Sequence, residues 1–172
     1  SRTTIMVVGD IMIDHYIWGK VGRISPEAPV PVVEVTSESL RLGGAANVVN
    51  NLHNLGARCC VCGVVGNDTI GIANSGVFFE NDRPTTVKTR VIAHSQQVVR
   101  YDRESRQDLS SVTTQRVMAH IQQHIDEVDS IIISDYGKGV ISQKLLAELL
   151  PLTRSKGKIV TVDPKVDHFS CY

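Results

Sequence analysis

Apolar runs typical of strands alternate along this chain with stretches that read as helices, and this alternation constrains the fold most. Residues 4–9 form an apolar, β-branched run of the kind found in strands that are buried on both faces. In residues 142–155, Leu145, Leu146 and Leu149 recur at helical spacing. Strand and helix patterns in alternation predict the α/β class, with a doubly wound, mostly parallel sheet and helices on both faces.

The same patterns give approximate bounds for each element. The segments that read as strands are residues 4–9, 30–35, 59–65, 88–94, 97–101, 130–134 and 158–162. The segments that read as helices are residues 45–55, 113–125 and 142–155.

Two stretches, 15–35 and 86–102, carry β signals without a helix between their strands. The second reads as a β-hairpin in which polar and apolar residues alternate. Extra strands outside a parallel core usually form a small second sheet that serves as a lid or a dimer surface. We therefore expect one domain over residues 1–172, with lid strands from about 15–35 and 86–102.

The stretch between residues 66 and 77 is too short for the predicted pattern. A helix-like start at Gly66 is cut off, and Val77 begins another strand almost at once. A parallel crossover needs a dozen or more residues. Either the chain departs from the alternating pattern here, or residues are absent from the sequence.

Charge and composition exclude several classes of partner. Lys plus Arg and Asp plus Glu are both 18, so nothing favours a nucleic-acid partner. The apolar runs are too short to span a membrane, and the N-terminus lacks a secretory signal. We expect a cytoplasmic protein. Its clustered cysteines read as small buried hydrophobes, and we expect no metal site at the helical pair His120 and His124.

Charged residues follow three of the predicted core strands. Asp10 and Asp14 come after the first strand, Asp135 and Lys138 after the strand at 130–134, and Asp163 and Lys165 after the strand at 158–162. Open α/β sheets bind their ligands at the carboxyl ends of their strands. These side chains are therefore predicted to meet at one rim.

A glycine turn and a group of hairpin cations add two further candidates. Gly43 and Gly44 open a predicted helix, and Asn47 adds a side chain suited to a sugar hydroxyl. A tight turn with a capping residue is the alternative. Arg90 and Arg100 could bind a phosphate bidentately, although hairpin edges also carry cations for solubility.

With these residues in view, the chain resembles the ribokinase-like (PfkB) carbohydrate kinases, and within them the D-glycero-β-D-manno-heptose 7-phosphate kinases. The motifs occur in order over nearly the whole chain. They are Gly9-Asp-Ile-Met-Ile-Asp14, Arg23-Ile-Ser-Pro-Glu-Ala-Pro-Val-Pro-Val-Val33, Gly43-Gly-Ala-Ala-Asn47, Pro84-Thr-Thr-Val-Lys-Thr-Arg90, Gln96-Gln-Val-Val-Arg100, Ser134-Asp-Tyr-Gly-Lys-Gly139 and Val162-Asp-Pro-Lys165.

The resemblance implies a role for each matched residue. Asp14 would bind sugar hydroxyls, and Gly43, Gly44 and Asn47 would form the sugar-site turn. The lid residues facing the sugar phosphate would be Arg90, Gln97 and Arg100. Beside the active site would lie Asp135 and Lys138, with Lys165 near a phosphate.

The implied reaction transfers the ATP γ-phosphoryl group to the anomeric hydroxyl of heptose 7-phosphate, with Mg²⁺, in lipopolysaccharide core biosynthesis. The resemblance also implies a homodimer formed through the lid strands. The family's Asp-Thr-x-Gly-Ala-Gly-Asp segment, which supplies the catalytic base, is absent from this sequence. We therefore expect the base beyond Tyr172, and an inactive chain without it. The alternatives are another ribokinase-like sugar kinase, or a non-catalytic module for sugar-phosphate binding or dimerisation.

Overall fold

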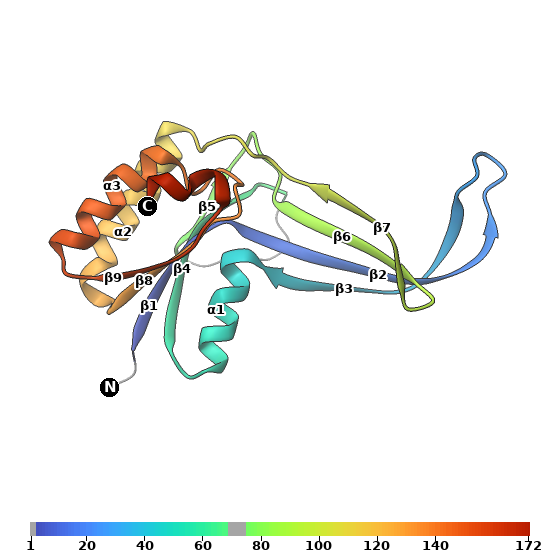
Figure 1. Cartoon of the computed structure of the whole chain (residues 1–172), viewed down its shortest axis with the longest axis horizontal. Helices are drawn as coiled ribbons and strands as arrows, with labels where there is room; N and C mark the ends of the chain where they lie inside the picture. Colours follow the sequence, from blue (N-terminus) through green and yellow to red (C-terminus); the bar gives the residue numbers. More distant parts are fainter. Residues whose placement is uncertain (1–2, 69–74) are drawn as a thin grey trace.

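The core of the protein is a five-stranded sheet, seen in a computed structural model that describes residues 3–68 and 75–172 (Figure 1). The strand order is β5-β4-β1-β8-β9, and every neighbouring pair is parallel. The bounds are β1 Thr4–Gly9, β4 Arg58–Gly66, β5 Val77–Glu80, β8 Ser130–Ser134 and β9 Ile159–Asp163. Each lies within two residues of the strand or strand start expected from the sequence.

Helices cover both faces of this sheet. Helix α1 (Gly44–Asn54) packs on one face, while α2 (Ser111–His124) and α3 (Gln143–Ser155) pack on the other (Figure 1). Each face of the sheet has its own hydrophobic core, and alternate residues of β1 point into one or the other. Val7 packs in the core under α1, and Met6 packs in the core under α2 and α3. The predicted doubly wound arrangement is confirmed. Short 3₁₀ helices follow α2 and β9, at Ile125–Glu127 and Val166–Cys171.

A second, four-stranded sheet projects from the core as a long arm (Figure 1). Its order is β3-β2-β6-β7, with β2 and β6 parallel and the outer pairs antiparallel. The bounds are β2 Ile11–Ile24, β3 Pro31–Gly43, β6 Thr86–Ala93 and β7 Gln96–Arg103. The sheet uses more of the chain than the expected lid ranges, since β2 begins at Ile11 and β3 runs on to Gly43.

The β6–β7 hairpin closes through a two-residue turn. His94 and Ser95 both have positive φ, at 49° and 64°. Two successive left-handed residues are typical of the type I′ turn, whose twist matches that of the flanking strands. The sequence predicted the hairpin, and the turn occupies the positions expected for it.

The short stretch after β4 connects two strands that lie parallel to each other. β4 and β5 pair in parallel, with Gly63 opposite Val77. Residues 69–74 of this connection lie outside the described residues. The hypothesis that residues are absent from the sequence concerns this part of the chain.

Of the clustered cysteines only Cys62 is buried as predicted, while Cys59 and Cys60 are partly buried. Cys62 is fully buried, and burial raises the pKa of its thiol to about 12, which leaves it inert as a nucleophile. In the described part of the chain, no group of three or more metal-ligating side chains gathers. None of the helices in the described ranges is long and apolar enough to cross a membrane.

Candidate active site

Asp10 is a buried carboxylate at the carboxyl end of β1, and it organises the loop that follows β8. Its side chain accepts three backbone N–H bonds, from Tyr136 at 2.8 Å, Lys138 at 3.2 Å and Val140 at 3.2 Å. Residues 135–140 make up this loop, the Lys138 loop. Asp10 therefore shapes the rim of the sheet rather than binding a ligand directly.

The backbone of Asp10 also ties the other rim elements together. Its N–H donates to the carbonyl of Ser134, and its own carbonyl accepts from the first turn of α1 at Ala45. Burial raises the pKa of Asp10, against the opposing effect of the three N–H donors. One residue thus links β1, β8 and α1.

The glycine turn has the close approach that its sequence suggested. Gly44 has a φ of +54°, and a Cβ there would lie 2.2 Å from the carbonyl oxygen of Asp10. At Gly43 a Cβ would lie 2.7 Å from Asp14 Oδ2. Gly44 requires glycine for its backbone conformation and for space, whereas a Cβ at Gly43 would crowd only the Asp14 side chain. The missing Cβ of Gly43 leaves Asp14 Oδ2 open to a ligand.

Asp14 lies on β2 and forms an ion pair with Arg90 of β6, with 2.5 Å between Asp14 Oδ1 and Arg90 Nη1. The guanidinium groups of Arg90 and Arg41 each lie 5.3 Å from the ring centre of Tyr16. A cavity of about 490 Å³ opens beside this group. Its lining residues are Asp14, Tyr16, Arg41, Leu42, Asn47 and Asn50.

Strand register extends this group into one charged surface. Asp14 pairs with Lys88 across β2 and β6, Lys88 with Asp102 across β6 and β7, and Arg90 with Arg100. Directly paired residues point to the same side of a sheet. We call this surface the polar lid face; it comprises Asp14, Tyr16, Arg41, Lys88, Arg90, Arg100 and Asp102.

Lys88 is a cation of this face that has room for an anion. Within the described ranges neither Lys88 nor Arg41 makes an ion pair, whereas Arg100 is held by Asp102 at 2.6 Å and Lys138 by Glu104 at 2.7 Å. Burial lowers the pKa of Lys88, and the positive charges of Arg100 and Lys138 lower it further. Its ammonium also lies 5.6 Å from the ring centre of Tyr136, which joins the polar lid face to the Lys138 loop.

The carboxylate of Asp135 faces the interior of the chain. It accepts from the N–H of Gly137 at 2.8 Å, pairs with His168 at 2.6 Å and accepts from the hydroxyl of Tyr172. Its side chain is fully buried. In this structure Asp135 therefore holds the Lys138 loop against the residues after β9, and it is not among the groups that line the cavity beside Asp14.

Lys138 and Lys165 line a separate hollow of about 230 Å³. Tyr136, Gly137 and His168 are among its other walls. The hollow lies where β8 and β9 end, so the two lysines meet at the rim as expected. Gln97 lies apart from both hollows, because it pairs with Ile92 next to the hairpin turn.

Reasoning from the sequence missed Tyr16 and Arg41 and left Lys88 out of the site. Tyr16 lies two residues beyond Asp14, and Arg41 pairs with Asp14 across β2 and β3. The period-two rule would have placed Tyr16 on the face of Asp14 once β2 was recognised as a strand. No local signal marks Arg41, since its place depends on strand register.

The parallel core with helices on both faces, its charged rim and the projecting four-stranded sheet define a ribokinase-like α/β protein. The family model described as pfkB family carbohydrate kinase matches residues 2–170, and the chain belongs to that family. Kinases of this family use ATP.

Curated relatives are similar in sequence to this chain over nearly its whole length. "Bifunctional protein HldE" of Helicobacter hepaticus is 49% identical over 179 residues, which is 98% of this chain and 37% of the relative. The protein of the same name from Desulfatibacillum aliphaticivorans is 45% identical over 183 residues, covering 100% of this chain and 37% of the relative. The chain thus spans well under half the length of these relatives.

Solved structures show the same fold at low sequence identity. Phosphofructokinase-2 from Escherichia coli in complex with fructose-6-phosphate superposes with a TM-score of 0.66 at 16% identity, over 99% of this chain and 57% of that one. Arabidopsis thaliana ribokinase complexed with ribose and ATP gives a TM-score of 0.62 at 13% identity, over 94% of this chain and 53% of that one.

Proposed function

We propose that this chain forms the sugar-phosphate side of an ATP-dependent kinase that acts on the anomeric hydroxyl of D-glycero-D-manno-heptose 7-phosphate. The observation that carries the proposal is the polar lid face, where Lys88, Arg90 and Arg100 surround Asp14. A carboxylate suits sugar hydroxyls, and a group of cations suits a phosphate. The strong identity to the HldE relatives supports the heptose over other sugars.

The residues of the chain would divide the work of holding the substrate. Asp14 Oδ2, left open by Gly43, would accept hydrogen bonds from sugar hydroxyls beside Asn47. Lys88 and Arg100 would hold the sugar phosphate on the polar lid face. Lys138 and Lys165 would stabilise negative charge at the rim, where phosphoryl transfer depends mainly on positioning and electrostatics.

Magnesium would come with the nucleotide. No metal-ligating group of three or more side chains gathers among residues 3–68 and 75–172, so these residues offer no cage for the ion. Mg²⁺ usually retains waters and binds through one or two carboxylates and substrate phosphates. No part of the proposal depends on a protein-bound metal.

A homodimer formed through the lid is part of the proposal. The sheet side opposite the polar lid face carries Ile13, Leu40, Val87, Val99 and Tyr101, which we call the apolar lid face. Leu40, Val99 and Tyr101 are each about half exposed, at 49%, 49% and 55%. A hollow of about 620 Å³ opens on this side, where Ile13, Leu40, Val87 and Tyr101 are joined by the polar residues His15, Glu38, Ser39, Thr89 and Arg103. Such an exposed apolar surface favours a protein contact, and a second copy would cover it symmetrically.

The test is ATP consumption by the whole protein of which this chain is part. Heptose 7-phosphate should be turned over with a higher kcat/KM than ribose or fructose 6-phosphate. Preference for ribose would assign another ribokinase-like activity. Binding of heptose 7-phosphate without turnover of any sugar would leave a non-catalytic module. Binding can be followed separately in this chain, because its single tryptophan, Trp18, stacks on Tyr16 at the site.

A further inference from the structure

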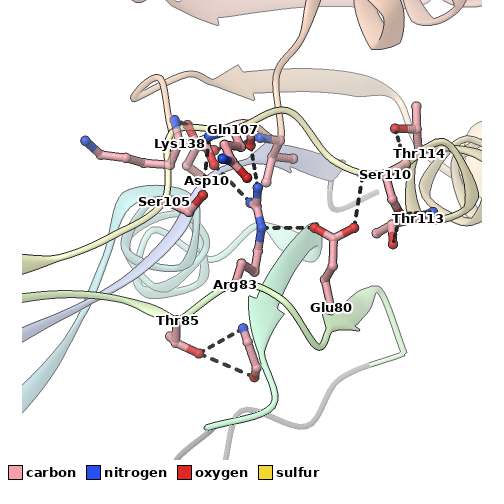
Figure 2. Close-up of polar contacts among 12 residues, drawn as sticks. Asp10, Glu80, Arg83, Thr85, Ser105, Gln107, Ser110, Thr113, Thr114 and Lys138 are labelled. Atoms are coloured by element: carbon pink, nitrogen blue, oxygen red, sulfur yellow. Dashed lines mark hydrogen bonds and ion pairs between the residues drawn. The ribbon is translucent and has the colours of Figure 1, made fainter.

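Arg83 is a buried arginine that lies outside the polar lid face and contacts the Lys138 loop (Figure 2). Its side chain is 8% exposed. Nη1 donates to the backbone carbonyl of Lys138 at 3.0 Å, Nη2 donates to the carbonyl of Gln107, and Nε lies 3.0 Å from Glu80 Oε2. The two terminal nitrogens thus donate hydrogen bonds within the chain, while Nε is close enough to Glu80 for an ion pair but makes no hydrogen bond.

The partners of Arg83 come from three different segments. Glu80 ends β5, just before the chain enters the lid at β6, and Gln107 lies where the chain returns from β7 to α2. Lys138 belongs to the loop after β8. Because a guanidinium is a rigid planar fork, it holds the entry to the lid, the exit from the lid and the Lys138 loop in one geometry.

Glu80 anchors this arrangement to the core. Its carboxylate also accepts from the N–H of Ser110, the N-cap of α2, at 3.0 Å. Burial acts to raise the pKa of Glu80, but hydrogen bonds from Ser110 and Thr113 and the charge of Arg83 outweigh it and hold the pKa below its usual value. Glu80 is therefore an ionised partner that keeps Arg83 in place.

Gly139 is shaped to this contact. It has a φ of +88°, and a Cβ there would lie 1.9 Å from the carbonyl oxygen of Gln107 and 3.0 Å from Arg83 Nη2. The Lys138 loop therefore packs directly against Arg83 and Gln107 without space for a side chain.

Lys138 is consequently held from three sides. Its N–H donates to Asp10, its carbonyl accepts from Arg83, and its ammonium pairs with Glu104, which directly follows β7. Two of these three contacts come from connections between the core and the lid. We propose that Arg83 is a positioning residue that couples the attachment of the lid to the placement of Lys138. The effect of this coupling on catalysis rests on the proposed function.

The first test is amide hydrogen exchange of the unliganded chain. Arg83→Lys keeps a positive charge for Glu80 but cannot reach three acceptors. It should speed exchange of the Tyr136, Lys138 and Val140 amides by about tenfold and leave those of β1 and β8 unchanged. The matched control is Arg103→Lys, since Arg103 joins the end of β7 to Asp68 at 2.8 Å without touching Lys138. Unchanged exchange in the Lys138 loop, or a uniform rise over the whole core, would overturn the proposal.

The second test measures coupling to Lys138 during turnover by the whole protein, with heptose 7-phosphate and ATP as substrates. Arg83→Lys should lower kcat by about tenfold, and Arg83→Lys in a Lys138→Met background should lower it by less than about twofold more. Additive losses would show that Arg83 does not act through Lys138. If the parent chain and the whole protein bind none of the sugars, the proposed function fails. The exchange experiment still decides the coupling.

Discussion

Asp14 of β2 and Arg90 of β6 lie 76 residues apart in the chain, yet only 2.5 Å separates Asp14 Oδ1 from Arg90 Nη1. Their pairing fixes one carboxylate oxygen and leaves the other beside Gly43, where a ligand can approach. A single contact therefore orients the residue proposed to bind the sugar and connects the lid to the glycine turn.

Replacing Asp14 by Asn should remove much of the sugar affinity. The change keeps the shape but removes the charge that receives sugar hydroxyls, so affinity for heptose 7-phosphate should fall about tenfold to a hundredfold. The pair is partly exposed, and its loss should lower stability by no more than about 1 kcal/mol. Calorimetric titration and thermal unfolding would measure the two effects. Glu38→Gln, which breaks the His15–Glu38 pair, is the control and should leave affinity unchanged. Equal losses in both variants would contradict the assignment.

Lys88→Met should raise stability while weakening phosphate binding. The pKa of Lys88 is lowered by burial and by neighbouring cations, so its charged form is disfavoured in the folded protein. Removing the charge should raise the melting temperature at pH 7. This gain should shrink as the pH rises through the lowered pKa towards 10.5, the ordinary value. Affinity for inorganic phosphate should fall about tenfold. The exposed Lys20 offers a control on the same sheet, and a Lys88→Met variant that binds phosphate normally would remove Lys88 from the site.

The effect of Asp10 on stability should depend on pH in a defined direction. Its pKa in the folded protein is raised above 3.8, so the folded state binds the proton more tightly than the unfolded state does. Its contribution to stability is therefore fully present below about pH 3.8 and declines as the pH rises through the raised pKa. Asp10→Asn should be destabilised by about 1–3 kcal/mol, because its amide N–H groups meet backbone donors. Denaturant unfolding should show the gap to the parent narrowing with rising pH. A widening gap would mean that the three backbone donors outweigh burial.

Gly139→Ala should be far more damaging than Gly157→Ala. Both glycines have positive φ, at +88° and +61°, but only at Gly139 would a Cβ meet other atoms within 4 Å. Gly157→Ala should cost about 1 kcal/mol for the backbone conformation alone. Gly139→Ala should cost more than about 3 kcal/mol, because Gln107 must also move. Urea unfolding of the two variants checks this, and equal costs would show that the contact at Gly139 is soft.

The apolar lid face should hold two copies together. Leu40→Asp places a charge on this face and should convert a dimer to a monomer in light scattering at micromolar concentration. Val112→Asp, at an exposed site on α2, should leave the dimer intact. A parent protein that is monomeric under these conditions would remove the dimer from the proposal.

The parallel core could be predicted nearly residue by residue, because its signals are local. The buried run at residues 4–9 and the spaced leucines of α3 encode their own structure through side-chain periodicity, and β1 and α3 occupy those places. The lid was harder to predict. Its strand β2 runs for 14 residues through polar and apolar positions with bulges, and neither face is fully buried, so the pattern that marks a core strand is weak.

The sequence by itself determined the α/β class, the rim of charged residues, the glycine turn and the hairpin, since each follows from short-range patterns of residue type. Only the tertiary structure decided what those charges do. Asp135 turned inward to His168 and Tyr172, while Asp10 became the anchor of the Lys138 loop. The tertiary structure also brought Tyr16, Arg41 and Lys88 into the site and placed the guanidinium of Arg83 against the backbone of Lys138. These outcomes depend on strand register and on contacts between distant segments, and no local pattern of residues encodes either one.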